Sequence, residues 1–183
     1  DYDYANRSVA AKAGSASDKP EFAIDSSALG GMYAGRIKLI GTESGVGVRA
    51  PESATAATGD FQITADGKLV LGGTVSARKT LRARSVNGSV DVQQNASLYG
   101  QETLILKAGG DIKVAKEATL GAGSQVELEA AGVDFDEAQL LAGMASGGTL
   151  AAGVGSIKVA TTGLSDFSAA SHLQAGEAIT FNV

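Results

Sequence analysis

The sequence predicts an all-β fold: a parallel β-helix (a solenoid) with about three strands per coil and a period of about 20–24 residues. Two observations predict it. One is the frequent placement of glycine before short apolar segments. The other is an apolar–variable–apolar triplet that occurs seven times, with first residues 23, 21, 22, 21, 24 and 22 positions apart, at Val46, Leu69, Val90, Ile112, Val133, Ile157 and Ile179.

Two further series of triplets follow the same period. The second series starts at Ile37, Phe61, Leu81, Leu104 and Val126, and continues weakly at Leu150–Ala152 and Leu173–Ala175. The third starts at Ala54, Val75, Ala96, Ala118 and Leu140. Alternation with a period of two is typical of strands with one buried face. We therefore expect three short strands per period, with an interior lined by Val90, Val92, Ile112, Val114, Val126 and Leu128.

Glycine marks the expected corners between strands. Asp66-Gly67, Asn87-Gly88 and Gly109-Gly110 supply the positive φ that tight corners need. Two-residue hairpins would also fit Asn-Gly, but they predict no long-range period. Leucine-rich repeats have a similar period, but their Leu-rich consensus with an Asn or Cys step is absent from this sequence.

The composition suits stacked coils. The chain has 183 residues, of which 44% are hydrophobic but only 5% aromatic, with no Trp. Small and β-branched side chains fit the narrow interior of a solenoid. One stretch leaves another structure open: residues 135–144 contain good helix formers between Asp134, which could cap a helix, and Gly143, which could end it. A short helix or a bulging loop are both compatible with that stretch.

The chain divides into two parts. Residues 1–20 lack periodicity and are expected to form a linker or surface loop, while residues 21–183 are expected to form the repeat segment, irregular at 136–153. The sequence has neither a transmembrane stretch nor a recognisable signal peptide, and its abrupt ends suggest a fragment of a longer protein. Because Cys is absent, stability must come from stacking rather than from disulfides.

A row of alternating charges is expected on one face of the solenoid. The middle residue of each first-series triplet should point away from the core. Neighbouring strands lie about 4.8 Å apart, so the middle residues should form a charge ladder of Asp91, Lys113, Asp134 and Lys158. Each exposed neighbour contact contributes roughly 0.2–1 kcal/mol at best. The ladder would also help to fix the register between coils.

The same residues argue against catalysis. Strict alternation leaves no acid cluster for calcium or for a catalytic carboxylate. His172 is the only histidine, so histidine triads and multi-histidine metal sites are not expected. Gly30-Gly31 and Gly45–Gly47 do not open helices, as phosphate-binding loops do. The sequence therefore predicts no enzyme, no metal and no cofactor.

The charge balance argues against nucleic acid as a partner. The formal net charge is −5, whereas phosphate binding needs a concentrated basic face. The one basic cluster, Arg78, Lys79, Arg82 and Arg84, is interpreted as a solvated corner and strand rather than as a polyanion site.

The segment from Ala28 to Arg49 reads ALGGMYAGRIKLIGTESGVGVR. It resembles the segment that follows the secretion domain in filamentous haemagglutinin and in related two-partner-secretion exoproteins, including those of contact-dependent growth inhibition. The preceding FAIDSSALGG strengthens the resemblance, which continues diffusely to residue 183. The residues that carry it most specifically are Gly30, Gly31, Met32, Tyr33, Arg36, Thr42 and Glu43.

This resemblance implies a right-handed parallel β-helix, export through an outer-membrane transporter, and a location that is secreted or on the bacterial surface. The implied role is a structural shaft that projects distal adhesive or toxin domains and contacts a host or neighbouring cell. The Asn-Pro motif of the secretion domain is absent, so this segment is not expected to engage the transporter itself. Met32 and Tyr33 are expected to fill the first coil. The alternative is a carbohydrate-active or carbohydrate-binding β-helix protein.

Overall fold

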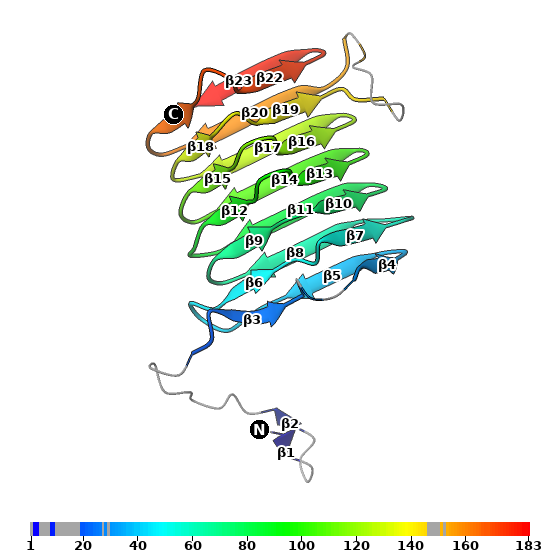
Figure 1. Ribbon diagram of the computed structural model, residues 1–183, viewed down its shortest axis with the longest axis vertical. Coiled ribbons are helices and arrows are strands. Elements are labelled where there is room, and N and C mark those ends of the chain that lie inside the picture. Colours follow the sequence, from blue (N-terminus) through cyan, green and yellow to red (C-terminus); the bar gives the residue numbers. More distant parts are fainter. Residues whose placement is uncertain are drawn as a thin grey trace.

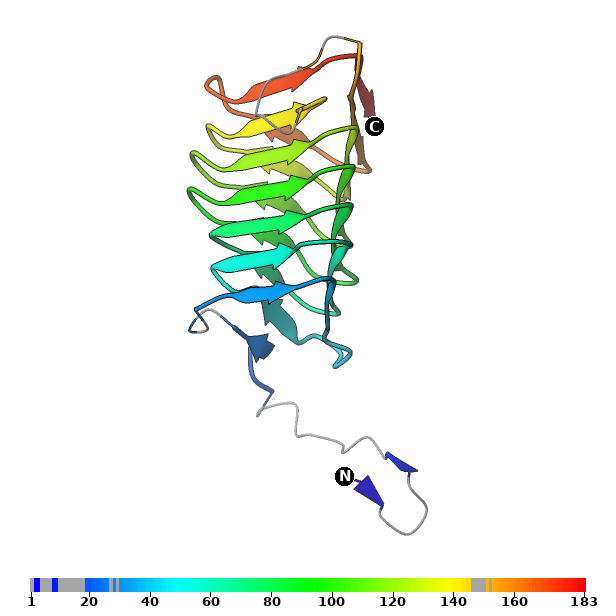
Figure 2. The same cartoon turned by 90° about the vertical axis from the view of Figure 1, so that its right-hand side faces the viewer.

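The computed structural model describes residues 2–3, 8–9, 19–26, 28, 30–145, 151 and 153–183. Within these residues the protein is all β and forms three parallel sheets of seven strands each. A separate antiparallel pair joins β1 (Tyr2–Asp3) to β2 (Ser8–Val9). The sheets wind into a solenoid that rises from β3 at one end to β23 at the other (Figures 1 and 2). The predicted fold class is confirmed.

Each sheet takes every third strand of the solenoid. Sheet 1 contains β3 (Phe22–Asp25), β6 (Gly47–Arg49), β9 (Leu69–Leu71), β12 (Val90–Val92), β15 (Ile112–Val114), β18 (Val133–Phe135) and β21 (Ser165–Phe167). Sheet 2 contains β4 (Met32–Ala34), β7 (Ser53–Ala56), β10 (Thr74–Ala77), β13 (Ser97–Gly100), β16 (Thr119–Ala122), β19 (Gln139–Ala142) and β22 (His172–Ala175). Sheet 3 contains β5 (Ile37–Ile40), β8 (Phe61–Ala65), β11 (Thr80–Ser85), β14 (Thr103–Ala108), β17 (Gln125–Ala130), β20 (Ser156–Thr161) and β23 (Ala178–Asn182).

One strand from each sheet makes one coil, so the stack has seven coils with about three strands each. Equivalent residues of successive coils pair in register: Val90 aligns with Leu69 below it and with Ile112 above it. Every backbone donor and acceptor in a central strand can therefore bond to a neighbouring coil, which is how a solenoid satisfies its main chain.

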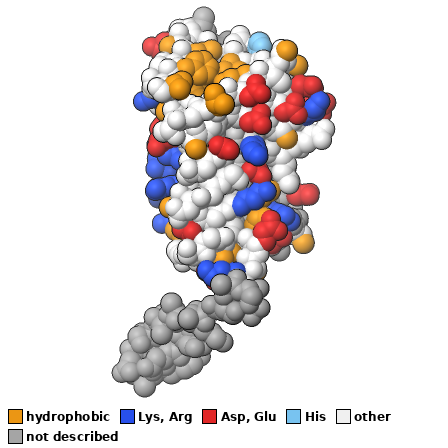
Figure 3. All heavy atoms as spheres, turned by 90° about the vertical axis from the view of Figure 1, so that its left-hand side faces the viewer, with side chains coloured by type: hydrophobic (Ala, Val, Ile, Leu, Met, Phe, Trp, Pro, Cys, Tyr) orange, Lys and Arg blue, Asp and Glu red, His pale blue; other side chains and the backbone are white. Residues whose placement is uncertain are grey.

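The core runs through the middle of the stack. The six side chains expected to line the interior are at most 2% exposed: Val90, Val92, Ile112, Val114, Val126 and Leu128. Burying each side chain of this size is worth roughly 1.5–3 kcal/mol. In the last coil the inward residues Ile179 and Phe181 are 41% and 50% exposed. Hydrophobic side chains gather at that end of the molecule in Figure 3.

A left-handed residue turns the chain at the corner between sheets 1 and 2 in four successive coils. These residues are Gly73, Asn95, Glu117 and Glu137, with φ of 59°, 60°, 60° and 50°. At Gly73 a side chain would also overlap the carbonyl oxygen of Glu52. Glycine is therefore required there by both conformation and space.

The first series of triplets is wrong at its last two members. Ile157 and Ile179 lie in β20 and β23 of sheet 3, where they continue the series of Ile37 and Val126. The cause is the long β19–β20 connection, which places Val126 and its partner Ile157 31 positions apart. The 24-residue step from Val133 to Ile157 therefore crosses from sheet 1 to sheet 3 within one coil and only resembles a period.

Other assignments shift or fail as well. The predicted positions of three triplets lie two residues too early. The residues that align with the first residues of the neighbouring triplets are Val48, Leu98 and Leu120, rather than Val46, Ala96 and Ala118. Leu173 pairs with Leu140 in sheet 2 rather than extending the second series. In Leu150–Ala152, residues 150 and 152 lie outside the described part of the chain.

No helix forms within the described residues between Phe135 and Met144. Gln139–Ala142 instead forms β19, in register with Thr119–Ala122 below it. Pairing with β16 and β22 outweighs the local helix propensity, which is worth only about a few tenths of a kcal/mol per residue. The part of the chain that the structure describes contains no helix suited to spanning a membrane.

Candidate functional site

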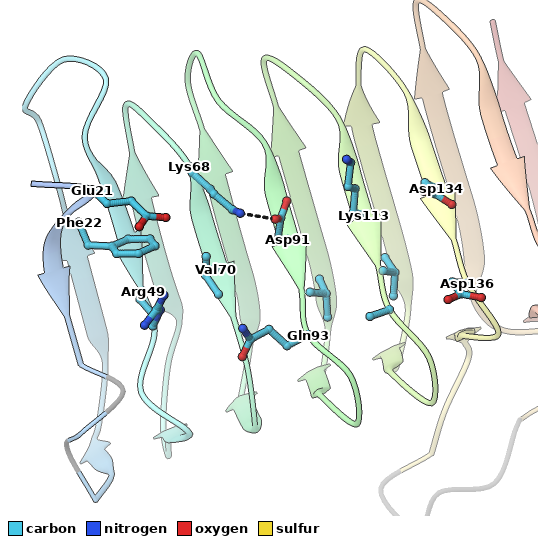
Figure 4. A pocket seen from close by; sticks show the side chains of 13 residues that line it. Glu21, Phe22, Arg49, Lys68, Val70, Asp91, Gln93, Lys113, Asp134 and Asp136 are labelled. Carbon is cyan, nitrogen blue, oxygen red and sulfur yellow. Dashed lines mark ion pairs between the residues drawn. The ribbon is translucent and has the colours of Figure 1, made fainter.

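A hollow of about 400 Å³ lies on the outer face of sheet 1. Successive strands each place one residue in a vertical row on this face, which contains Arg49, Val70, Asp91, Lys113, Asp134 and Asp166. Acidic and basic side chains alternate over part of the face in Figure 3, and Figure 4 shows the row from close by. Three of the four expected ladder residues, Asp91, Lys113 and Asp134, therefore occupy neighbouring rungs.

The ion pairs of this row are not the ones that the ladder implies. Asp91 is bound by Lys68, with 2.7 Å between Nζ and Oδ2, and it accepts a hydrogen bond from the Ser89 hydroxyl at 2.9 Å. Figure 4 shows Lys68 reaching Asp91 from the neighbouring coil. Within the described residues, Lys113 and Asp134 form no ion pair within 4.0 Å. Lys113 thus lies on the rung between two aspartates without a direct ion pair in the described part of the chain.

The lower end of the hollow is basic and aromatic. Arg49 Nη1 lies 3.3 Å from Asp25 Oδ2, and the Arg49 guanidinium stacks 4.4 Å from the centre of the Phe22 ring. The Nε of Arg49 is buried and has no hydrogen-bond partner among the described residues. The Arg49 guanidinium is thus partly covered by the Phe22 ring, and Glu21 lines the hollow beside them.

The upper end of the hollow is acidic, because Asp134 and Asp136 both line it (Figure 4). No group of three or more His, Cys, Asp or Glu side chains in the described segments is arranged to hold a metal ion. The hollow is therefore lined by charges of both signs, with Glu21 and Arg49 at one end, Lys113 in the middle and two aspartates at the other end.

Lys158 does not belong to the ladder. It lies in β20 of sheet 3, where it aligns with Glu127 below and Thr180 above. The reason is the long β19–β20 connection, which displaces the chain by one sheet relative to a constant period. The expected contact between Asp134 and Lys158 is therefore absent, and Asp134 aligns with Asp166 instead.

Sheet 3 carries its own charge network. Lys107 Nζ lies 2.9 Å from Glu127 Oε1 and 2.6 Å from Glu129 Oε2. The hydrogen bond to Glu129, followed by that to Glu127, raises the pKa of Lys107, and the same lysine lowers the pKa of Glu129. These side chains are partly exposed, so the network adds only modestly to stability.

The residues that carried the resemblance lie in the first coil. Gly30 and Gly31 precede β4, in which Met32 packs partly against the core. Tyr33 does not fill the coil: its side chain is 74% exposed and points outward. The reason is strand alternation, because an inward Met32 forces its neighbour outward. A Cβ on Gly31 would lie 2.9 Å from the Tyr33 ring, so glycine leaves room for the ring.

The other three residues of that motif lie on the surface. The Arg36 side chain covers Gly59 of the next coil, where a Cβ would be only 2.7 Å from Arg36 Nε. Thr42 and Glu43 are exposed in the β5–β6 connection, where the Glu43 carbonyl accepts a hydrogen bond from Val46 N at 3.1 Å. These positions shape the first two coils and do not converge with the charged hollow.

Sequence reasoning missed Lys68, Gln93 and Asp136, which line the hollow beside the middle row. Each lies at a corner, just before or after a sheet 1 strand. The sequence gives no regular signal for them, because the equivalent positions of other coils hold residues such as Gly72, Ala115 and Gly132.

Comparisons with known proteins support the resemblance. The chain is 40% identical over 99 residues to a Yersinia pestis protein named Toxin CdiA, covering 54% of this chain and 3% of that protein. It is 35% identical over 122 residues to the tRNA nuclease CdiA of Yersinia mollaretii, covering 58% and 4%. It is 40% identical over 90 residues to the 16S rRNA endonuclease CdiA of Enterobacter cloacae, covering 48% and 3%.

No family model matches the chain, and no solved structure matches it. In each of these alignments about half of this chain is matched. The aligned stretch covers only a few per cent of the relative's own length.

The expectation of no enzyme is overturned by these names, because relatives are called tRNA nuclease and 16S rRNA endonuclease. The exclusion of nucleic acid as a partner is weakened for the same reason. Both expectations came from residues of this segment alone, whereas the relatives that carry these names are far longer than the stretch aligned here. The resemblance itself is confirmed: the chain is similar, over about half its length, to CdiA-like exoproteins of contact-dependent growth inhibition.

Proposed function

We propose that this chain is a segment of the extracellular shaft of a contact-dependent growth inhibition exoprotein. Its parent would be exported by two-partner secretion through an outer-membrane transporter and held at the bacterial surface. Residues 1–20 would serve as a linker, and residues 21–183 as haemagglutinin-type repeats. The shaft would project distal adhesive or toxin domains toward a receptor or glycan on a host or neighbouring cell.

The observation that carries this proposal is the unbroken stacking of seven coils in three sheets. Six steps at about 4.8 Å each give a rise of about 29 Å between the first and last coils. Such a structure is held by contacts between neighbouring coils, so its length can grow by adding coils without altering the rest. The similarity to CdiA proteins, which are far longer than this segment, supports a spacer of this kind.

The test is a register-preserving deletion in the parent exoprotein. Because Val90 aligns with Ile112, removing residues 90–111 deletes one full coil, β12 to β14, and joins β9 directly beneath β15. The matched control removes residues 90–100, which cuts β12 and β13 and leaves β14 without its coil. Surface display and contact-dependent inhibition of neighbouring cells are measured for both.

The full-coil deletion is expected to keep display and inhibition near the level of the intact protein, whereas the partial deletion should lose both. If the full-coil deletion abolishes inhibition while display survives, the segment does more than act as a spacer and the proposal fails. Equal tolerance of both deletions would show that stacking in this region is dispensable, which also contradicts it.

A further inference from the structure

Sheet 2 differs from the other two sheets in having no charged side chains. None of its seven strands contains an Asp, Glu, Lys or Arg. Sheet 1 presents Arg49, Asp91, Lys113 and Asp134, and sheet 3 presents residues such as Arg82 and Lys107. The strands of one of the three long faces therefore carry no Asp, Glu, Lys or Arg side chain, and charged residues such as Arg78 lie only at its edges.

The outward side chains of sheet 2 are mostly hydroxyls. The middle row reads Tyr33, Thr55, Ser76, Tyr99 and Gly121 in successive coils. A parallel row contains Ser53, Thr74, Ser97 and Thr119. Ser76 donates to Thr55 at 3.3 Å, and the hydroxyls of Tyr33 and Ser53 lie 3.1 Å apart. These Ser, Thr and Tyr hydroxyls can each both donate and accept hydrogen bonds.

Tyr99 stands between two hollows on this face. One, of about 240 Å³, is lined by Tyr99 with Ser97, Thr119, Gly121 and Met144. The other, of about 220 Å³, is lined by Tyr99 with Thr55, Ser76, Arg78 and Gln101. The Arg78 guanidinium at its edge already donates to Gln101 Oε1. Tyr99 thus lines both hollows.

The Tyr99 ring is held in place. Its hydroxyl donates to the carbonyl oxygen of Met144 at 3.4 Å. Gly121 aligns with Tyr99 in the next coil, and a Cβ on Gly121 would lie 3.2 Å from Tyr99 Cδ2 and 3.0 Å from Met144 Sδ. The absent side chain at Gly121 therefore lets the ring and the methionine approach the sheet. A preorganised aromatic ring loses little freedom when a ligand binds to it.

We propose that the outer face of sheet 2, from Tyr33 to Tyr99, binds a neutral polysaccharide. A sugar ring offers apolar C–H faces that stack on aromatic rings and hydroxyls that pair with Ser and Thr. The two tyrosines lie three rungs apart, or about 14 Å, so they would contact one extended chain at two points. An anionic polymer would instead favour sheet 3, where Arg82 and Arg84 are exposed. The site does not depend on the shaft proposal, because it needs only the folded chain.

The experiment uses affinity electrophoresis of this chain in native gels cast with amylose, galactomannan, mixed-linkage β-glucan or dextran. Heparin and polygalacturonate serve as anionic probes. At least one neutral polysaccharide is expected to retard the protein, with retardation unchanged in high salt. Tyr33→Ala and Tyr99→Ala should each weaken binding about tenfold or more, as loss of an aromatic anchor does. Tyr99→Phe should retain most binding, since it keeps the ring.

Arg82→Ala and Lys38→Ala, both at exposed positions of sheet 3, are matched surface controls and should bind like the unmodified chain. Thermal unfolding verifies that each variant is folded, and Tyr33→Ala removes a 74% exposed side chain, so its fold should persist. The proposal is overturned if no neutral polysaccharide retards the chain, if only the anionic probes do, or if both tyrosine variants bind normally. It is also overturned if sedimentation shows the face occupied by a second copy, through a dimer that Tyr99→Ala dissociates.

Discussion

Replacing Ile112 by alanine probes the stacked core where it is best covered. Ile112 is fully buried in β15 and aligns with Val90 below it and Val133 above it. Truncating a buried isoleucine costs about 2–5 kcal/mol, because the apolar contacts are lost and a cavity remains. That is a large part of a total stability of about 5–15 kcal/mol. The next residue, Lys113, points outward without an ion pair in the described residues, so Lys113→Ala should change stability by less than about 0.5 kcal/mol.

Urea unfolding followed by far-UV circular dichroism measures both variants. At about 1–3 kcal/mol per molar urea, Ile112→Ala should lower the unfolding midpoint by roughly 1 M or more, and Lys113→Ala should leave it almost unchanged. Hydrogen exchange should also accelerate most in β12, β15 and β18, because coils of a solenoid are coupled to their nearest neighbours. Equal shifts for the two variants would refute the inward and outward assignment of this strand.

Three further outcomes are expected. Gly73→Ala should destabilise the fold by about 1–3 kcal/mol, because φ is 59° and the new Cβ would meet the backbone of Glu52. Gly45→Ala is the control: its φ is 75° but a Cβ there would lie in open space, so it should cost less. Thermal unfolding compares the two variants. Lys107→Met should remove at most about 1 kcal/mol near neutral pH. Because Lys107 lowers the pKa of Glu129, that contribution is present above the ordinary carboxyl pKa of 4.5 and is lost as pH falls through the lowered value. Because the pKa of Lys107 is raised, the contribution of this ion pair is also lost as pH rises from the ordinary lysine pKa of 10.5 through the raised value. The unfolding free energies of the unmodified chain and of Lys107→Met should therefore converge at both pH extremes. Asp91→Asn should change stability by less than about 1 kcal/mol, because it removes the ion pair with the partly exposed Lys68 while the amide oxygen can still accept from Ser89. A larger loss in urea unfolding would show that this ion pair holds the corner.

The repeat and its buried rows could be predicted from the sequence because they depend on local alternation. Val90 and Val92 alternate with Asp91, and Val126 and Leu128 alternate with Glu127, so the burial of the apolar members matches the expectation. The constant period failed at Ile157, because residues added in one connection move the next strand to another sheet while leaving a spacing that resembles a repeat.

The charged site was only partly predictable. The alignment of Asp91, Lys113 and Asp134 follows from the period, but the partner of Asp91 does not. Lys68 reaches it because a long, flexible side chain at a corner can extend across a rung, which depends on three-dimensional geometry rather than on triplet position. Tyr33 was assigned to the interior for its size, yet alternation with Met32 directs it to solvent.

The neutral face of sheet 2 was hidden for a related reason. Its strands are the third and faintest series in the sequence, and two of its triplets were aligned two residues early. Once Leu98 and Leu120 are recognised as inward residues, Tyr99 and Gly121 become outward neighbours. Only then do the two tyrosines lie on the same row.

The central claim is a rigid stack of seven coils, and a single distance tests it most directly. Lys38 and Thr180 are exposed on sheet 3 in the first and last coils and are linked by six in-register pairings. The chain has no cysteine, so Lys38→Cys and Thr180→Cys allow unique spin labelling. Pulsed electron paramagnetic resonance should give a narrow distribution near about 30 Å, from six rungs of about 4.8 Å. A broad distribution would contradict the account. So would a mean distance well beyond about 40 Å, because rungs at a spacing of about 4.8 Å cannot span it in six steps.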